Sequence, residues 1–313
     1  MEQNSVSIAA EKPKRKKPSH TSGMSRALVR RETISAYFFL LPSLVFFVAF
    51  VVVPMFICVF YSLFDYSLGG LNIAEDFVGL DNYIQLFQDP VFHRGFINTV
   101  IIVVVAVPCV TAFSLWVGSA IYKMKAFSRS FFRCVFYLPV VTGSVAITVV
   151  WKWILDPYNG ILNKLIGTDG YNWLGEGRTA LMCIIVILFT TSIGQPIVLY
   201  VAALGNVDHS IIEAAQVDGA TKLQVFWRIK WPSIMPTTLY VLVITTINSF
   251  QCFALIQLMT RGGPMNATMT IMYQVYYSAY TLNDLGYANA IGVVLAVIIA
   301  IFSAIQFKLA KTD

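Results

Sequence analysis

Six apolar runs, each long enough to cross a lipid bilayer, dominate the sequence, and none of them contains an acidic residue. A membrane-spanning helix needs about 20 predominantly apolar residues. The composition agrees, because 57% of the residues are hydrophobic and 12% are charged, against about 25% charged in an average soluble domain. We therefore predict an all-α integral membrane protein with six transmembrane helices, at residues 36–62, 97–121, 131–154, 179–204, 236–259 and 288–309.

Basic residues are divided unevenly between the two sides that these spans define. If both termini lie on one side, that side holds 17 of the 22 Lys and Arg residues. Cytoplasmic loops of membrane proteins carry such an excess, so we expect both termini and the loop at about 205–235 to face the cytosol. We expect residues 1–35 to be a disordered cytosolic tail whose basic run, Lys12–Lys17, lies on anionic lipid rather than on nucleic acid. The membrane domain would then occupy residues 36–313.

The sequence lacks residues that several transport and enzyme mechanisms need. No Asp or Glu lies inside a span, although ion-coupled carriers usually keep one there. A GxxxxGK[ST] phosphate-binding loop is missing, so any ATP that drives transport must bind to another chain. The five Cys and three His residues form no metal-binding pattern. We predict a protein that is not an enzyme and has no catalytic residue, metal or cofactor of its own.

Proline and glycine interrupt four of the spans, at Pro54, Pro108, Pro139 and the pair Gly194 and Pro196. Proline removes a backbone hydrogen bond, and the freed carbonyl then needs another partner. Transporters place substrate sites at such breaks, but packing kinks have the same signature, so the residues alone leave both interpretations open.

Three loops are expected on the outer side of the membrane, and they are rich in aromatic and amide side chains. The first, at 77–100, predicts a short helix that is ended by Pro90. The fifth connection opens with a turn signal at Thr260–Pro264. These loops either dock an external protein or cover the mouth of the helix bundle.

The cytosolic segment from Ser210 to Pro236 predicts two short helices. Ser210 and Glu213 fit a capping box at the start of a helix over about 211–217, and Gly219 supplies the positive φ that ends it. Thr221 and Gln224 fit a second capping box. That second helix would end at Trp231, because Pro232 disfavours a helical predecessor, and Pro236 would open the fifth span.

The two predicted helices offer two kinds of surface. Ala214, Ala215 and Gly219 form a small-residue face that a partner's backbone can approach closely, while Val225, Phe226 and Ile229 form an apolar face. An amphipathic linker lying at the membrane interface would explain the apolar face only. We therefore favour a docking site for a partner protein.

The same segment resembles the EAA loop of the permease subunits of binding-protein-dependent ABC importers. The motif matches at Glu213, Ala214, Ala215, Gly219, Ile229 and Pro232, with Trp231 where leucine is usual. Segments such as "FVGLDNYIQLF", "YLPVVTGSVAITVVWKWIL" and "LIQLMTRGGP" look like the sugar-importing branch, which includes the maltose-type and glycerol-phosphate-type permeases. The resemblance implies the type I ABC importer permease fold, in a bacterial cytoplasmic membrane.

The resemblance also implies partners. Glu213, Ala214, Ala215, Asp218 and Gly219, with Ile229 and Pro232 of the motif, would couple the chain to an ATPase subunit, which binds ATP and Mg²⁺. The assembly would contain a second homologous permease, forming a heterodimer, together with two ATPase subunits and an external solute-binding protein. It would import a sugar or oligosaccharide, and no nucleic acid is involved.

Sugar contacts in maltose-type permeases lie on the spans before and after the EAA loop. Aligned by motif, the resemblance implies a substrate pathway at Thr190, Gly194, Ile197, Thr245, Ser249, Gln251 and Cys252, with Gln195 and Asn248 nearby. Phe250 or Phe253 would stack on a sugar face. Another solute such as glycerol phosphate remains an alternative, although it favours a basic group that no span offers away from its edges, and an ion-coupled carrier is a further alternative. Helix–helix hydrogen bonding is the competing interpretation of each polar residue.

Overall fold

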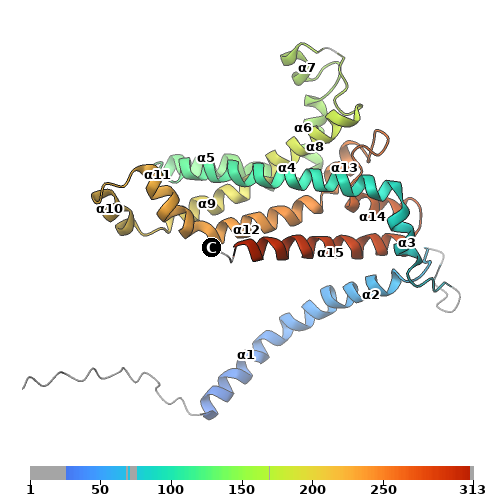
Figure 1. Ribbon diagram of the computed structural model, residues 1–313, viewed down its shortest axis with the longest axis horizontal. Helices are drawn as coiled ribbons and strands as arrows, with labels where there is room; N and C mark the ends of the chain where they lie inside the picture. Colours follow the sequence, from blue (N-terminus) through green and yellow to red (C-terminus); the bar gives the residue numbers. More distant parts are fainter. Residues whose placement is uncertain (1–25, 68–69, 71–75, 169, 311–313) are drawn as a thin grey trace, which may run out of the picture. The chain divides into compact units, whose positions relative to one another are not determined.

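The computed structural model describes residues 26–67, 70, 76–168 and 170–310, which form helices joined by turns and a few isolated bridges (Figure 1). By their contacts the residues divide into two units, 1–56 and 57–313. With η marking a π-helix, the elements are α1 Arg26–Phe47, η1 Val48–Val52, α2 Val53–Tyr61, α3 Asp81–Gln88, α4 Pro90–Ile121, α5 Ala126–Val141, α6 Ser144–Ile154, α7 Ile161–Ile166, α8 Gly177–Ser192, α9 Gly194–Gly205, α10 His209–Val217, α11 Lys222–Val225, η2 Phe226–Lys230, α12 Trp231–Phe250, α13 Ala254–Met259, α14 Ile271–Tyr280 and α15 Leu285–Ala310.

Five stretches of helix in the described residues are long and apolar enough to cross a membrane. They are Thr33–Tyr61, Pro90–Ile121, Gly177–Gly205, Lys222–Met259 and Leu285–Leu309. A sixth span results only if α5 and α6, which are bent by 96° at their junction, count as one. The expectation of a multi-pass, all-α membrane protein is confirmed, but the third apolar run is not a single straight helix.

The break between α5 and α6 lies at Thr142 and Gly143, whose backbones are extended, with ψ of 128° and 143°. Pro139 lies in the last turn of α5 and donates no helical hydrogen bond. The carbonyl of Leu138 accepts both the backbone N–H of Thr142 at 3.2 Å and the Thr142 hydroxyl at 2.8 Å. The break therefore leaves two polar side chains, Thr142 and Ser144, at the corner of a bent span.

Proline has different effects in the other spans. Pro108 does not interrupt α4, which is continuous, so that part of the sequence prediction is wrong. Just before Pro54 the chain widens into η1, where the N–H of Val53 donates to the carbonyl of Val48. A wider turn gives the proline ring room and explains why the helix continues past it.

The predicted boundary at residue 35 does not coincide with the start of a helix. Residues 26–35 belong to α1, which begins at Arg26, because apolar and strong helix-forming residues continue the helix N-terminally. The basic run Lys12–Lys17 lies outside the described residues.

Helix α4 lies at the centre of residues 57–313. It packs against α8, α9, α12 and α14, and α12 packs in turn against α15 (Figure 1). At the crossing with α9, a Cβ added to Gly118 would lie 2.8 Å from the Cβ of Tyr200. Small residues allow such close helix contacts in membrane proteins, so this glycine fixes the distance between α4 and α9.

The bundle formed by residues 57–313 has two distinct ends (Figure 1). Helices α10 and α11 lie at the end where α15 finishes, and α3 and α14 lie at the opposite end. At that opposite end the predicted short helix before Pro90 is confirmed as α3. Pro90 then occupies the first turn of α4, where its missing N–H costs no helical hydrogen bond.

Asp89 joins three helices at this end. One carboxylate oxygen accepts the N–H of Val91 at 2.8 Å and caps α4. The other accepts the Gln274 amide of α14 at 2.8 Å and the Tyr287 hydroxyl of α15 at 2.7 Å. A single carboxylate therefore fixes α14 relative to α4 and α15.

Replacing Asp89 with alanine should destabilise the bundle. The cap and two hydrogen bonds to a charged acceptor are lost together, an effect of about 2–4 kcal/mol. We expect a clear fall in the melting temperature of the purified protein in detergent, monitored by circular dichroism. Asp81→Ala is the matched control, because Asp81 is exposed in the first turn of α3. Equal melting temperatures of the two variants would contradict this role of Asp89.

Candidate functional site

The turn between α9 and α10 places the N-cap of α10 two residues earlier than the sequence predicted. Asp208 is the N-cap, and its carboxylate accepts the N–H of Ser210 at 2.9 Å. The predicted capping box at Ser210 and Glu213 is therefore wrong, because a second capping side chain stands upstream and extends the helix to His209. The backbone N–H holds the pKa of Asp208 below its ordinary value, so the cap is lost only as pH falls through that lowered pKa.

The end of α10 has the predicted geometry. Gly219 has a φ of +82°. Its N–H donates to the carbonyl of Gln216 at 3.1 Å, and the N–H of Ala220 donates to the carbonyl of Ala215 at 2.9 Å. This pair of bonds is a Schellman motif, which satisfies the last carbonyls of a helix. The capping box at Thr221 and Gln224 is also confirmed, with the Thr221 N–H donating to Gln224 Oε1 at 2.8 Å.

The second helix does not stop before Pro232. It continues from α11 through η2 into α12, so the predicted end at Trp231 and the predicted start of the span at Pro236 are both wrong. The N–H of Trp231 donates five residues back, to the carbonyl of Phe226. This wider turn accommodates the proline that follows, as it does before Pro54. A rigid connection between the hairpin and the span results.

The α10–α11 hairpin, residues 208–225, is anchored by its buried side chains. Ile212 of α10 and Val225 of α11 lie in one apolar cluster with Tyr200 and Leu204 of α9 and Ile234 of α12. Tyr122, at the end of α4, accepts a hydrogen bond from Lys230 Nζ, which also lies 4.8 Å from the centre of the Tyr122 ring. Cation–π contact and packing hold the hairpin to three helices.

The predicted coupling residues fall into two groups, on this hairpin and in the η2 turn and α12 that follow it. Glu213, Ala214, Asp218 and Gly219 are exposed together on its outer side, and Pro232 is exposed at the start of α12. Ala215 and Ile229 are half-buried and pack against the apolar cluster. The exposed group forms a surface that a partner can reach, whereas Ala215 and Ile229 contribute to the anchor.

Helix α12 leads from this hairpin to a cavity of about 270 Å³, which is also lined by residues of α8, the helix that precedes α9. The cavity lies where three helical stretches are broken: between α5 and α6, between α8 and α9, and between α12 and α13. Its lining has hydroxyl and amide groups but no charged side chain, and consists of Pro139, Val140, Thr142, Ser144, Ile147, Leu188, Thr191, Asn248, Gln251, Cys252, Phe253, Ala254 and Leu255. Hydroxyls and amides both donate and accept hydrogen bonds, so the cavity suits a neutral, hydroxyl-rich molecule.

Part of the predicted substrate pathway lines this cavity. Asn248, Gln251 and Cys252 do so, and Phe253 supplies an aromatic wall. The structure places the other predicted residues outside it, namely Thr190, Gly194, Gln195, Ile197, Thr245 and Ser249. Among them, Thr245 and Ser249 are buried in α12, and Ile197 is buried against α4. Phe250, the other proposed stacking residue, packs against Phe302 of α15 with ring centroids 5.2 Å apart.

Sequence reasoning missed Thr142, Ser144 and Thr191, which also line the cavity. The signal for the first two was the Thr-Gly-Ser sequence shortly after Pro139, since polar residues beside a helix break are typical of transporter sites. Thr191 is adjacent to the predicted Thr190, and the hydroxyls of both donate to the carbonyl of Ile187 within α8, but only Thr191 lines the cavity. An alignment by motif cannot resolve such a shift of one residue.

Gly194 lies in a close helix contact rather than in the cavity. A Cβ at this position would lie 2.4 Å from the backbone oxygen of Phe136 in α5. Gly194→Ala should therefore force α5 and α9 apart and destabilise the protein by about 1–3 kcal/mol, read as a lower melting temperature in detergent. Gly205→Ala is the control, because an added Cβ there meets nothing within 4 Å. An unchanged melting temperature for Gly194→Ala would disprove the contact.

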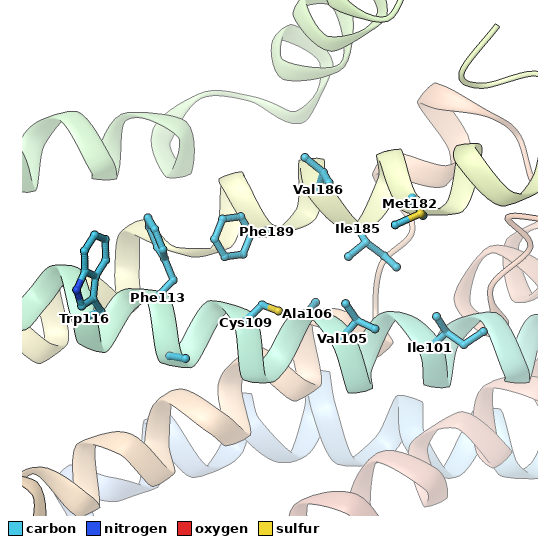
Figure 2. A pocket seen from close by; sticks show the side chains of 11 residues that line it. Ile101, Val105, Ala106, Cys109, Phe113, Trp116, Met182, Ile185, Val186 and Phe189 are labelled. Atoms are coloured by element: carbon cyan, nitrogen blue, oxygen red, sulfur yellow. The ribbon is translucent and has the colours of Figure 1, made fainter. Parts of the chain in front are cut away.

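A larger groove of about 740 Å³ runs between α4 and α8. Figure 2 shows Met182, Ile185 and Phe189 of α8 facing α4 across it. Its walls are hydrocarbon apart from the Cys109 thiol, the Met182 thioether and the Trp116 indole. Such a surface suits lipid tails or an apolar helix, so size alone does not make it the place where a polar solute binds.

Known proteins resemble this chain along most of its length. Residues 92–312 match the model of the family described as "Binding-protein-dependent transport system inner membrane component". The "Probable ABC transporter permease protein YurN" of Bacillus subtilis is 34% identical over 91% of this chain and 99% of its own length. The "Multiple sugar-binding transport system permease protein MsmF" of Streptococcus mutans is 29% identical over 90% of this chain and 98% of its own length.

A third relative and a solved structure complete the comparison. The "sn-glycerol-3-phosphate transport system permease protein UgpA" of Salmonella typhimurium is 28% identical over 87% of this chain and 92% of its own length. A chain of a bacterial ABC transporter for the import of the acidic polysaccharide alginate superposes with a TM-score of 0.74 at 23% identity. That match covers 91% of this chain and 97% of the other, and it supports the fold alone.

Proposed function

The chain belongs to the family of inner membrane components of binding-protein-dependent transport systems, and on this premise we propose that it carries a sugar or oligosaccharide across the bacterial cell membrane. It would act as the permease subunit of an ATP-driven importer. The cavity between the broken helices is the observation that carries this proposal. The hydroxyl and amide side chains among its otherwise apolar lining match the hydroxyl groups of a sugar.

A phosphorylated solute fits the same cavity less well. Phosphate recognition normally uses Arg or Lys, and the cavity lining contains neither. The relative named for sn-glycerol-3-phosphate transport therefore does not set the substrate of this chain. A neutral sugar is the better match to the residues present.

The conformational change that ATP hydrolysis causes in a partner ATPase would act on this chain at the exposed face of the α10–α11 hairpin. The chain has no phosphate-binding loop of its own, so a partner ATPase would bind ATP and Mg²⁺. Displacement of the hairpin would move α9 and α12, because Ile212 and Val225 pack against both. Helix α12 reaches the cavity at Asn248, and α9 follows directly on α8, which reaches the cavity at Thr191. Movement of these helices would couple the nucleotide-driven motion to the substrate site.

The hairpin end of the bundle would face the cytosol. Basic residues cluster there, following α4 at Lys123 and Lys125, in the hairpin and η2 at Lys222, Arg228 and Lys230, and near the end of α15 at Lys308. Positive charge marks the cytosolic side of membrane proteins. The α3 and α14 end would then face an external solute-binding protein. The complete importer would contain a second homologous permease and two ATPase subunits.

Reconstituted transport tests the proposal. The chain would be purified with the second permease, the ATPase and the binding protein of its own importer, placed in liposomes and supplied with internal ATP. We expect uptake of at least one labelled disaccharide from a panel of maltose, cellobiose and diacetylchitobiose. Uptake of labelled glycerol 3-phosphate with no uptake of any sugar would contradict the assignment.

A further inference from the structure

A row of aromatic rings leads from the surface of the α14 end to the polar cavity. Tyr280 is 70% exposed, and its ring centroid lies 5.1 Å from that of Tyr276 one turn earlier. The ring centroid of Tyr276 lies 4.9 Å from that of Phe253, which lines the cavity. Three rings from two separate elements therefore form a continuous path from solvent to the cavity wall.

Buried contacts hold this row in place. Tyr273, beneath Tyr276 on α14, is 4% exposed, and a Cβ added to Gly262 would lie 3.0 Å from its ring. The hydroxyl of Thr270, the N-cap of α14, donates to the carbonyl of Cys252 at 3.2 Å. Gln274 is held by Asp89. The helix that carries the two tyrosines is thus tied to the same break that shapes the cavity.

The direction of the row separates it from an ordinary membrane-interface belt. Belt tyrosines stand at the level of the lipid headgroups and serve as anchors there. In this chain the ring nearest the surface is the most exposed, the next is half-buried, and the last forms part of the cavity. A belt does not require the rings to continue inward to a polar site.

We propose that Tyr280, Tyr276 and Phe253 form an entrance subsite that binds pyranose rings by stacking and passes them to the cavity. The C–H face of a pyranose is apolar and packs on an aromatic face, while its hydroxyl groups remain free for polar partners. The subsite rests on the proposed function, because it delivers a sugar to the cavity where Asn248 and Gln251 would bind it. Sugars released by the binding protein would meet Tyr280 first.

The test uses the reconstituted importer and the same panel of labelled disaccharides. Three variants are compared with the unchanged protein: Tyr280→Ala, Tyr276→Leu and the double variant Tyr276→Phe with Tyr280→Phe. Leucine keeps apolar bulk in the half-buried position and protects folding. Tyr158→Ala is the control, because Tyr158 is 80% exposed and lies outside the row. Sugar uptake and ATP hydrolysis are measured together, with the sugar-loaded binding protein at saturation.

We expect sugar uptake to fall about tenfold in Tyr280→Ala and Tyr276→Leu, equivalent to a barrier increase of ~1.4 kcal/mol. Uptake in the Phe variant and in Tyr158→Ala should stay close to that of the unchanged protein. ATP hydrolysis stimulated by the loaded binding protein should persist in all four, so that fewer sugars enter per ATP. This ratio reports on the sugar path and not on assembly.

Other outcomes overturn the proposal. If Tyr280→Ala and Tyr276→Leu lower ATP stimulation together with uptake, the tyrosines dock the binding protein instead. If both variants transport normally, the row has only a packing role, and the proposed function is unaffected. If the unchanged protein transports no sugar of the panel, the proposed function and the subsite fail together.

Discussion

Gly219→Pro should abolish uptake by breaking the hairpin through which ATP hydrolysis is proposed to act. Gly219 has a φ of +82°, and its N–H donates to Gln216. Proline cannot adopt this angle and has no N–H, so the Schellman motif cannot form. A local penalty of about 3 kcal/mol or more follows, and association with the ATPase should be lost. Co-purification of the two subunits and vesicle uptake are the measurements.

Two further variants separate the shape of the hairpin from its contact surface. Gly219→Asn should retain association, because asparagine tolerates the left-handed conformation. Glu213→Lys should weaken association without changing the fold, since Glu213 is exposed and caps nothing in α10. If Gly219→Pro and Glu213→Lys both assemble and transport normally, the hairpin is not the coupling site.

The second large effect is expected in the cavity. Replacing Asn248 and Gln251 with leucine removes two amides from its lining and leaves sugar hydroxyls without partners in an apolar surrounding. An unsatisfied buried polar group costs about 1–3 kcal/mol, so two such losses should reduce uptake at least about thirtyfold. Assembly with the ATPase should survive, because both side chains are exposed in the isolated chain and support no packing.

Ser249→Ala is the informative comparison for this double variant. Ser249 was implied by the motif alignment, but it is buried in α12 and does not line the cavity. We expect its replacement to leave uptake nearly unchanged. Strong loss of uptake in Ser249→Ala, with normal uptake in the double leucine variant, would place the sugar path on the other face of α12.

Local rules predicted the hairpin well, because its geometry depends on a few neighbouring residues. Gly219 and the pair Thr221 and Gln224 adopt the conformations that their side chains favour. Prediction failed at Ser210, where the upstream Asp208 is equally suited to cap a helix. It failed again at Pro232, because the η2 turn, with the packing of buried Val225 and half-buried Ile229, lets the helix continue past the proline.

The substrate path was harder to predict, because it depends on which face of each helix is turned inward. Asn248 and Ser249 are both polar neighbours in α12, and successive residues of an α-helix are about 100° apart around its axis. Packing against α15, through contacts such as Phe250 with Phe302, buries one face. Asn248 and Gln251 are left facing the break of the third span.

By itself the sequence determined the membrane solvent, the helical class, the positions of the apolar runs and the capped hairpin, because each depends on composition or on residues within a few positions. Only the tertiary structure decided that the third run bends by 96°, that Thr142, Ser144 and Thr191 join Asn248 and Gln251 around one cavity, and that Tyr280, Tyr276 and Phe253 line up toward it. These side chains come from helices far apart in the sequence, and their meeting depends on how the helices pack, which no local pattern specifies.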